Sequence, residues 1–116
     1  MDNISIRCVV FNNPEEKNWK AVALDLDIVT EAGSRDEAME CLKELIEMQI
    51  SFAASRGEIG SIWKDAPEEY WRKYHEARRY HAAAIYGQGA DSVDEAASDI
   101  PFPRPQNQNG FQIQSA

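Results

Sequence analysis

The feature that most constrains this chain is a change of hydrophobic period between residues 19 and 56. Over residues 19–27, apolar side chains alternate with small or acidic ones, which is typical of a β-strand. After Gly33 the apolar residues recur every three or four positions, which is typical of an amphipathic helix. A strand that leads directly into such a helix predicts a sheet with a helix packed on it, the α+β class.

Sequence signals mark both ends of this helix. Ser34 and Glu37 have the spacing of a capping box, in which the Ser34 hydroxyl accepts a hydrogen bond from the Glu37 amide. Gly57 suits the position after the helix, so we predict a helix over 35–56. Its apolar arc is wider than one face of a three-stranded sheet requires, and we expect the excess to cover a second helix or a partner subunit. The arc consists of Ala38, Met39, Cys41, Leu42, Leu45, Ile46, Met48, Ile50, Phe52 and Ala53.

The first 32 residues predict three antiparallel strands. The first spans 4–11 and the second 19–27, with a polar hairpin loop over 12–18 between them, and 28–32 forms a short third strand. One face of the sheet is expected to pack on the long helix. On that face we place Ile4, Ile6, Cys8, Val10, Val22, Leu24 and Leu26, and on the opposite face Ala21, Ala23, Asp25 and Asp27.

The remaining sequence predicts a second helix and a tail. Asp65 and Pro67 are typical of a helix start, and an aromatic stripe continues to residue 86, so we predict a helix over 66–86 that packs beside the first helix or mediates assembly. Residues 1–86 then form one domain with a helical extension at 58–86. The tail over 87–116 is expected to be mobile, with alternation at 111–115 that fits a short edge strand.

Composition restricts the classes of partner. The chain of 116 residues carries a formal net charge of −8, which disfavours direct nucleic-acid binding. The sequence begins without the pattern of a secretory signal and has no apolar run long enough for a membrane span, so we expect a cytoplasmic protein with no membrane partner. Cys8 and Cys41 lack the spacing of a metal or redox motif and are interpreted as small core residues.

Few residues have a pattern that indicates chemistry. Asp25 and Asp27 are two apart on the predicted strand, so their carboxylates share a face, and Glu31 is the nearby acid that could join them. A two-metal site needs more carboxylates than these, and a solvated outer face is the favoured interpretation. His75 and His81 are six apart, whereas two ligands on one helical face lie three or four apart. We therefore predict no catalytic residue, no metal, no cofactor and no enzyme activity.

A set of aromatic, turn and capping residues carries a family resemblance. These residues are Trp19, Ala21, Val22, Asp25, Leu26, Val29, Thr30, Gly33, Ser34, Glu37, Ala38, Leu42, Lys43, Glu44 and Ile46, followed later by the Ile-Pro-Phe-Pro run at 100–103. In this pattern the chain resembles the HicB-like antitoxin family, which has a β-β-β-α core of truncated ribonuclease-H-like fold. The chain departs from the family in three places. It has no Pro-Gly-Cys between strands two and three, it has an extra helix at 58–86, and nothing over 87–116 resembles a DNA-binding module.

The resemblance implies a non-catalytic antitoxin, or a stand-alone relative, that masks a small basic RNA-cleaving protein of the HicA-like toxin type. The acidic charge suits such a partner, and Asp25, Asp27 and Glu31 are the residues we expect to contact it. The alternative is a homo-oligomeric structural or interaction protein without a toxin. In either case we expect a homo-oligomer, and its subunit interface would use Trp71, Tyr74, Phe111 and Ile113.

Overall fold

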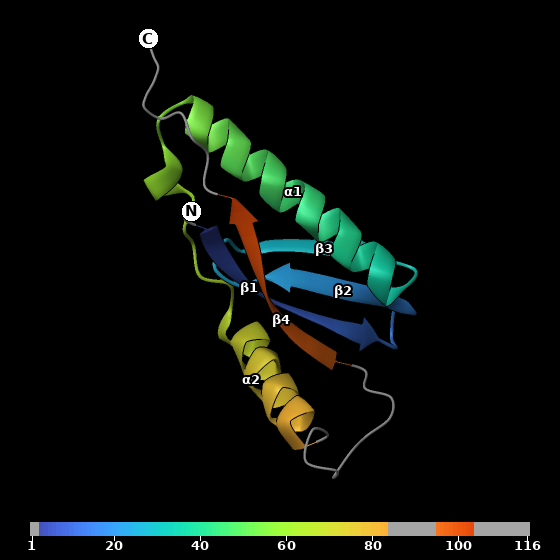
Figure 1. Cartoon of the computed structure of the whole chain (residues 1–116). Helices are drawn as coiled ribbons and strands as arrows, with labels where there is room; N and C mark the ends of the chain where they lie inside the picture. The colour runs from blue at the N-terminus through green and yellow to red at the C-terminus, as the bar shows by residue number, and fades with distance from the viewer. Residues whose placement is uncertain (1–2, 84–94, 104–116) are drawn as a thin grey trace.

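The structure is a computed structural model that describes residues 3–83 and 95–103, and it shows an antiparallel sheet of four strands with a helix on each face (Figure 1). The strands follow the spatial order β3-β2-β1-β4. The predicted α+β class is confirmed, with four strands where we expected three. The elements are β1 (Asn3–Asn13), β2 (Asn18–Ala23), β3 (Ile28–Ala32), α1 (Arg35–Ser55), the short 3₁₀ helix η1 (Ile59–Ser61), α2 (Glu68–Ala83) and β4 (Glu95–Pro103).

Strand β1 lies at the centre of the sheet and is apolar on both faces. It pairs with β2 on one side and with β4 on the other. As predicted, Ile4, Ile6, Cys8 and Val10 share one face, where they pack under α1. Val9 and Phe11 point to the other face and are buried beneath α2. Because helices cover both faces of the sheet, β1 buries nearly every apolar side chain that it carries.

The structure corrects both the length and the facing of the second strand. Strand β2 ends at Ala23, and residues 24–27 form a turn before β3. Val22 and Leu24 lie on the α2 side of the sheet, whereas Ala21 and Ala23 lie on the α1 side. The predicted facing of Val22 and Leu24 was therefore wrong, because the prediction assumed only one buried face and gave the larger side chains to it. Leu26 does reach the α1 side, but from the turn.

Helix α1 begins at Arg35 as predicted and ends at Ser55, one residue before the predicted end. Ser34 caps it, with its Oγ accepting a hydrogen bond from the Glu37 amide at 3.1 Å. At the other end the Glu58 amide donates to the Ala53 carbonyl, and the Gly57 amide donates to the Ala54 carbonyl. Gly57 has φ = +70°, so this is a Schellman motif, which requires a left-handed residue after the helix.

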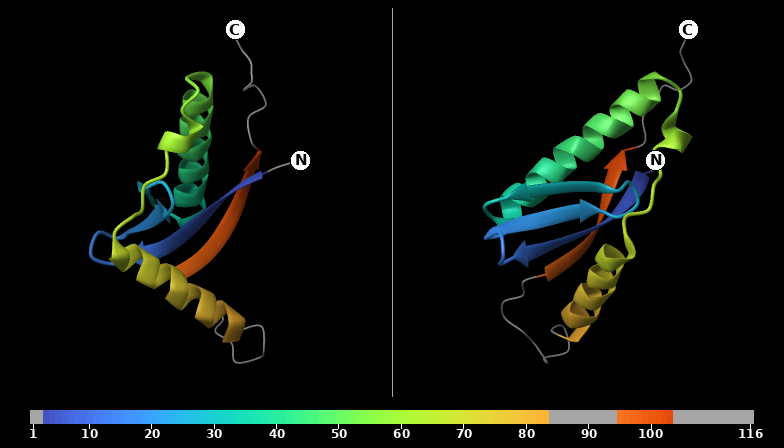
Figure 2. Two further views of the ribbon diagram at one scale, coloured as in Figure 1. Left: turned by 90° about the vertical axis from the view of Figure 1, so that its left-hand side faces the viewer. Right: turned by 180° about the vertical axis from the view of Figure 1, so that it is seen from behind.

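The two helices lie on opposite faces of the sheet, so the molecule has three layers (Figure 2). Helix α1 covers β3 and β2 with a stripe of five buried residues, Ala38, Leu42, Ile46, Ile50 and Ala53. Helix α2 packs against β4 and β1 on the other side. Of the two roles predicted for this helix, packing beside α1 is wrong, and the role in assembly stays a prediction. Consequently α2 leaves the excess apolar arc of α1 uncovered.

Strand β4 lies in a part of the chain that we expected to be mobile. Residues 95–103 run antiparallel to β1 from Phe11↔Glu95 to Asn3↔Pro103, so that expectation was wrong for this segment. Its prolines, Pro101 and Pro103, made a strand difficult to predict, because proline is tolerated in a sheet only where its missing amide is not required, as on an edge strand. The short strand predicted at 111–115 lies outside the described residues.

Candidate interaction surface

The turn at residues 24–27 holds two of the three carboxylates predicted to bind a partner. Asp25 and Asp27 do not share the face of a strand as predicted, because β2 ends before them. Asp27 adopts a left-handed conformation with φ = +56°, which aspartate tolerates better than most residues. The turn therefore reverses the chain into β3 and directs the two side chains to different partners.

Asp25 is engaged with β1. Its Oδ2 accepts a hydrogen bond from the Arg7 amide at 2.8 Å, and its Oδ1 lies 2.6 Å from Arg7 Nη2. The side chain of Asp25 is only 11% exposed. Since β2 has ended, the carboxylate occupies the place of a strand partner for the Arg7 amide. Asp25 thus holds the turn on the sheet, and its side chain offers little surface to another molecule.

The same turn anchors the connection that leads to α2. The Lys64 amide donates to the Asp25 carbonyl at 2.9 Å, and the Ala66 amide donates to the Leu24 carbonyl at 3.0 Å. Lys64 Nζ also lies 3.8 Å from Asp27 Oδ2. These contacts fix the path of the chain after η1 and hold the segment at 62–64 at the end of the sheet.

Glu31, the third predicted carboxylate, lies apart from the turn on the edge strand β3. One of its oxygens accepts a hydrogen bond from Asn18 Nδ2 at 3.0 Å, and the other lies 3.7 Å from Lys20 Nζ. Within residues 3–83 and 95–103, no group of three or more histidine, cysteine or acidic side chains is arranged to hold a metal ion. Asp27 and Glu31 remain predicted partner contacts.

The aromatic residues predicted at a subunit interface pack on the chain's own sheet. Tyr74 is 4% exposed, and its hydroxyl donates to Asp99 of β4 at 2.6 Å. Burial, together with this hydrogen bond, raises the pKa of the Tyr74 phenol. Trp71 is half-buried and lies against the Arg7 guanidinium, 4.7 Å from the ring centroid. Phe111 and Ile113 lie outside the described residues.

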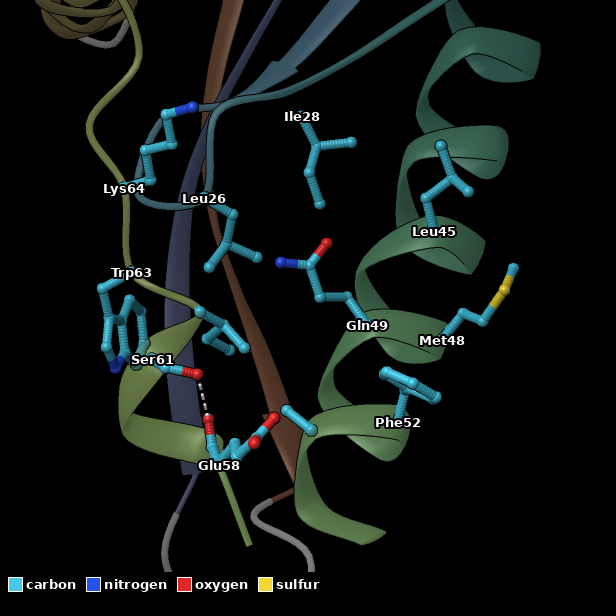
Figure 3. A pocket seen from close by; sticks show the side chains of 12 residues that line it. Leu26, Ile28, Leu45, Met48, Gln49, Phe52, Glu58, Ser61, Trp63 and Lys64 are labelled. Atoms are coloured by element: carbon cyan, nitrogen blue, oxygen red, sulfur yellow. Dashed lines mark hydrogen bonds between the residues drawn. The ribbon is translucent and has the colours of Figure 1, made fainter. Parts of the chain in front are cut away.

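An open groove lies between the C-terminal half of α1 and the connection that follows it (Figure 3). Its volume is about 730 Å³. Helix α1 forms one wall, η1 and residues 62–64 form the other, and the turn and β3 form the floor. The lining residues are Leu26, Ile28, Leu45, Met48, Gln49, Phe52, Ala53, Glu58, Ser61, Ile62, Trp63 and Lys64.

The groove displays large apolar side chains to solvent. Met48 is 61% exposed, Phe52 63% and Trp63 46%, and Leu45 is also exposed. Apart from Val29, every large hydrophobic side chain that is exposed in the described part of the chain lines this groove. The wide apolar arc predicted for α1 contained this signal, but the sequence alone could not show which of its residues stay uncovered.

Comparisons with known proteins find no match for this chain. A scan of protein families finds no matching model, and searches of curated proteins and of solved structures find no significant match. Among the described residues, no helix is both long and apolar enough to span a bilayer. The HicB-like resemblance therefore remains a prediction from the sequence pattern.

Proposed function

We propose that this protein is a HicB-like antitoxin, or a stand-alone relative of one, that binds and masks a small basic RNA-cleaving toxin. The observation that carries the proposal is the order of elements, in which three consecutive antiparallel strands lead directly into the capped helix α1. This is the β-β-β-α arrangement that the resemblance implies. The proposed role is binding without catalysis, in the cytoplasm.

The charge of the chain supports a cationic partner. A net charge of −8 on 116 residues attracts a basic protein over a distance comparable with the Debye length, about 8 Å at physiological salt. Such attraction speeds and orients encounter more than it adds to final affinity. The proposal therefore requires a second feature that supplies affinity, and an exposed apolar surface is the usual one.

The predicted contact residues differ in how well they can be tested. Asp25 is tied to Arg7, so its reversal would disturb the sheet as well as any contact. Asp27 and Glu31 make longer ion pairs at the surface, at 3.8 and 3.7 Å. Asp27→Asn, which keeps a residue that tolerates φ > 0, combined with reversal of Glu31 is therefore the cleaner test of their role, whereas a loss of binding in an Asp25 variant would have two explanations.

The function is tested by purifying the protein from its native host and identifying what accompanies it. We expect a small basic protein in stoichiometric amount. By itself this partner should cleave RNA, and it should stop cleaving when the protein described here is added back. Cleavage by an unrelated ribonuclease, with and without the protein described here, is the control for non-specific inhibition. A small basic partner whose RNA cleavage the acidic chain leaves unchanged would refute the proposal.

The alternative of a homo-oligomer without a toxin rests on one observation, the exposed apolar residues of α1. The same purification separates the two functions. A pure homo-oligomer, with no basic protein at any salt concentration used, would favour the alternative and contradict the antitoxin role.

A further inference from the structure

We infer that the groove between α1 and residues 58–64 is the docking surface for an amphipathic helix of a cationic protein. The inference builds on the proposed function, because it assigns the partner's binding to one surface. It also moves the main contact away from Asp25, Asp27 and Glu31. Apolar side chains of the partner helix would enter the groove, and its lysine or arginine residues would face the outer surface of α1.

The apolar anchors have the spacing that a helix recognises. Leu45, Met48 and Phe52 follow one another at i, i+3 and i+7, so they form a line along one side of α1 about 10 Å long. Trp63 stands on the opposite wall (Figure 3). An amphipathic helix laid between two such walls is a common mode of protein recognition. Methionine adapts to different partners, and tryptophan is often an energetic anchor.

Acidic residues continue along the outer surface of α1 beside the anchors. Glu40, Glu44 and Glu47 are all exposed, and Lys43 is the one base among residues 36–47. Glu44 has Glu40 four residues before it and Glu47 three residues after it, so its nearest neighbours on the helix are like charges. Lys43 lies three residues after Glu40 and four before Glu47, so it offsets part of this repulsion and leaves these four residues with a net charge of −2. A cationic partner would relieve that repulsion.

The basic residues at the groove have acidic partners within the chain. Arg56 pairs with Glu58 at 3.3 Å, and Lys64 pairs with Asp27 at 3.8 Å. These two pairs cancel locally and leave the acidic surface of α1 as the net charge beside the apolar line. The combination of exposed apolar anchors with unbalanced negative charge is complementary to a basic amphipathic helix.

Two other occupants fit the groove less well. A small molecule is normally enclosed over most of its surface, whereas Met48 and Phe52 are more than half exposed and leave the groove open. A second copy of this chain would bring a second acidic α1 against the first, and each copy carries a charge of −8. Like charges facing each other oppose association.

The test measures binding of a lysine–leucine peptide, with leucine at helical spacing, to the full chain by isothermal titration calorimetry. In Met48→Ala/Phe52→Ala the affinity should fall about tenfold, because two anchors are lost. In Glu40→Gln/Glu44→Gln it should fall severalfold and depend less on salt. Glu40, Glu44, Met48 and Phe52 are all exposed, so both double variants should fold. Circular dichroism verifies that they do.

Matched controls separate the groove from general attraction. Glu15→Gln/Glu76→Gln changes the net charge by the same amount at exposed positions on the β1–β2 turn and on α2. Val29→Ala removes an exposed apolar side chain that does not line the groove. We expect both controls to bind within about twofold of the original chain, since neither touches the anchors. A glutamate–leucine peptide of the same pattern should bind far more weakly.

Three outcomes would overturn the inference. The first is equal peptide affinity in the groove variants and in the controls. The second is tighter binding of the glutamate–leucine peptide. The third is a self-associated chain that becomes monomeric in Met48→Ala/Phe52→Ala, which would assign the groove to a second copy. If the groove variants still neutralise the toxin fully, the proposed docking surface is wrong and the proposed function stands. If the groove binds the peptide but no toxin exists, only the proposed function is wrong.

Discussion

At the scale of single residues, Asp25 shows how a carboxylate that looks like a binding residue can be a structural one. It lies just past the end of β2, where the Arg7 amide of β1 would otherwise lack a strand partner. Its carboxylate supplies that partner and an ion pair with the Arg7 guanidinium. From the sequence we expected Asp25 to contact a partner. Its structural role could not be predicted, because that role depends on where β2 ends.

Replacing Asp25 should therefore destabilise the fold. Asp25→Asn removes the charge-assisted hydrogen bonds to Arg7, and we expect the free energy of unfolding to fall by about 1.5–3 kcal/mol. Asp27→Asn is the matched control, since it keeps a residue that tolerates φ > 0 and loses only a surface pair, which is worth about 0.5 kcal/mol or less. Urea unfolding measures both. Equal losses in the two variants would argue against the structural role of Asp25.

The two cysteines should differ in reactivity. Cys8 is buried under α1 as predicted, and burial raises the pKa of its thiol to about 12. Cys41 is exposed, so its predicted place in the core was wrong. Of the two thiols in the chain, we expect one to react with Ellman's reagent in the folded protein at neutral pH, and both in urea. Rapid reaction of both thiols without denaturant would contradict the packing of β1 beneath α1.

The raised pKa of Cys8 also gives stability a pH dependence. Below the ordinary thiol pKa of about 9, Cys8 is neutral in both the folded and the unfolded chain, so the full stability is present. As the pH rises from about 9 to about 12, the unfolded chain ionises first and stability is lost. Cys8→Ala should remove this alkaline loss, although it also leaves a small cavity at every pH.

At the scale of elements, the ends of α1 test the importance of local signals. Gly57 has φ = +70°, and a Cβ added there would meet nothing within 4 Å, so any cost of Gly57→Ala is conformational. We expect a loss of about 1 kcal/mol. Gly60→Ala is the control, because that position is equally open and is not left-handed, and it should be neutral or slightly stabilising. Thermal unfolding that ranks the two variants in the opposite order would refute the Schellman motif.

How much of each element could be predicted depends on whether its signal is local. The capping box at Ser34 and the glycine after α1 are local, and both ends of the helix were predicted to within a residue or two. The facing of Val22 and Leu24 depends on which helix covers which face, and that is decided by α2 and β4, far along the chain. Strand β4 was missed because its pairing with β1 is long-range and its sequence is short of strand-forming residues.

The candidate surface was predictable only in part. The apolar arc of α1 was visibly too wide for one sheet face, which is a local property of residues 38–53. Which part of the arc stays exposed depends on α2 lying on the opposite face of the sheet, and no pattern within α1 contains that information. Asp25 and Asp27 were predicted on the outer face of the second strand, but β2 ends at Ala23, before either residue.

At the scale of the whole molecule, the three layers divide the protein into two unlike surfaces. Around α2, aromatic and charged side chains form contacts within the chain, such as Tyr74 with Asp99 and Arg7 with Trp71. Around α1, Met48 and Phe52 are left exposed beside a row of acids. The side chains around α2 thus make contacts within the chain, whereas α1 carries the exposed apolar surface that a partner would cover.

The most direct measurement is a map of amide chemical shifts on the isotope-labelled chain during titration with the lysine–leucine peptide. We expect the largest changes in the C-terminal half of α1, around Met48 and Phe52, and in residues 58–64, with their size falling as salt is added. Amides of α2 and β4 should change little. Changes centred on α2 and β4, or spread evenly over the chain, would contradict binding of a cationic helix by the α1 groove.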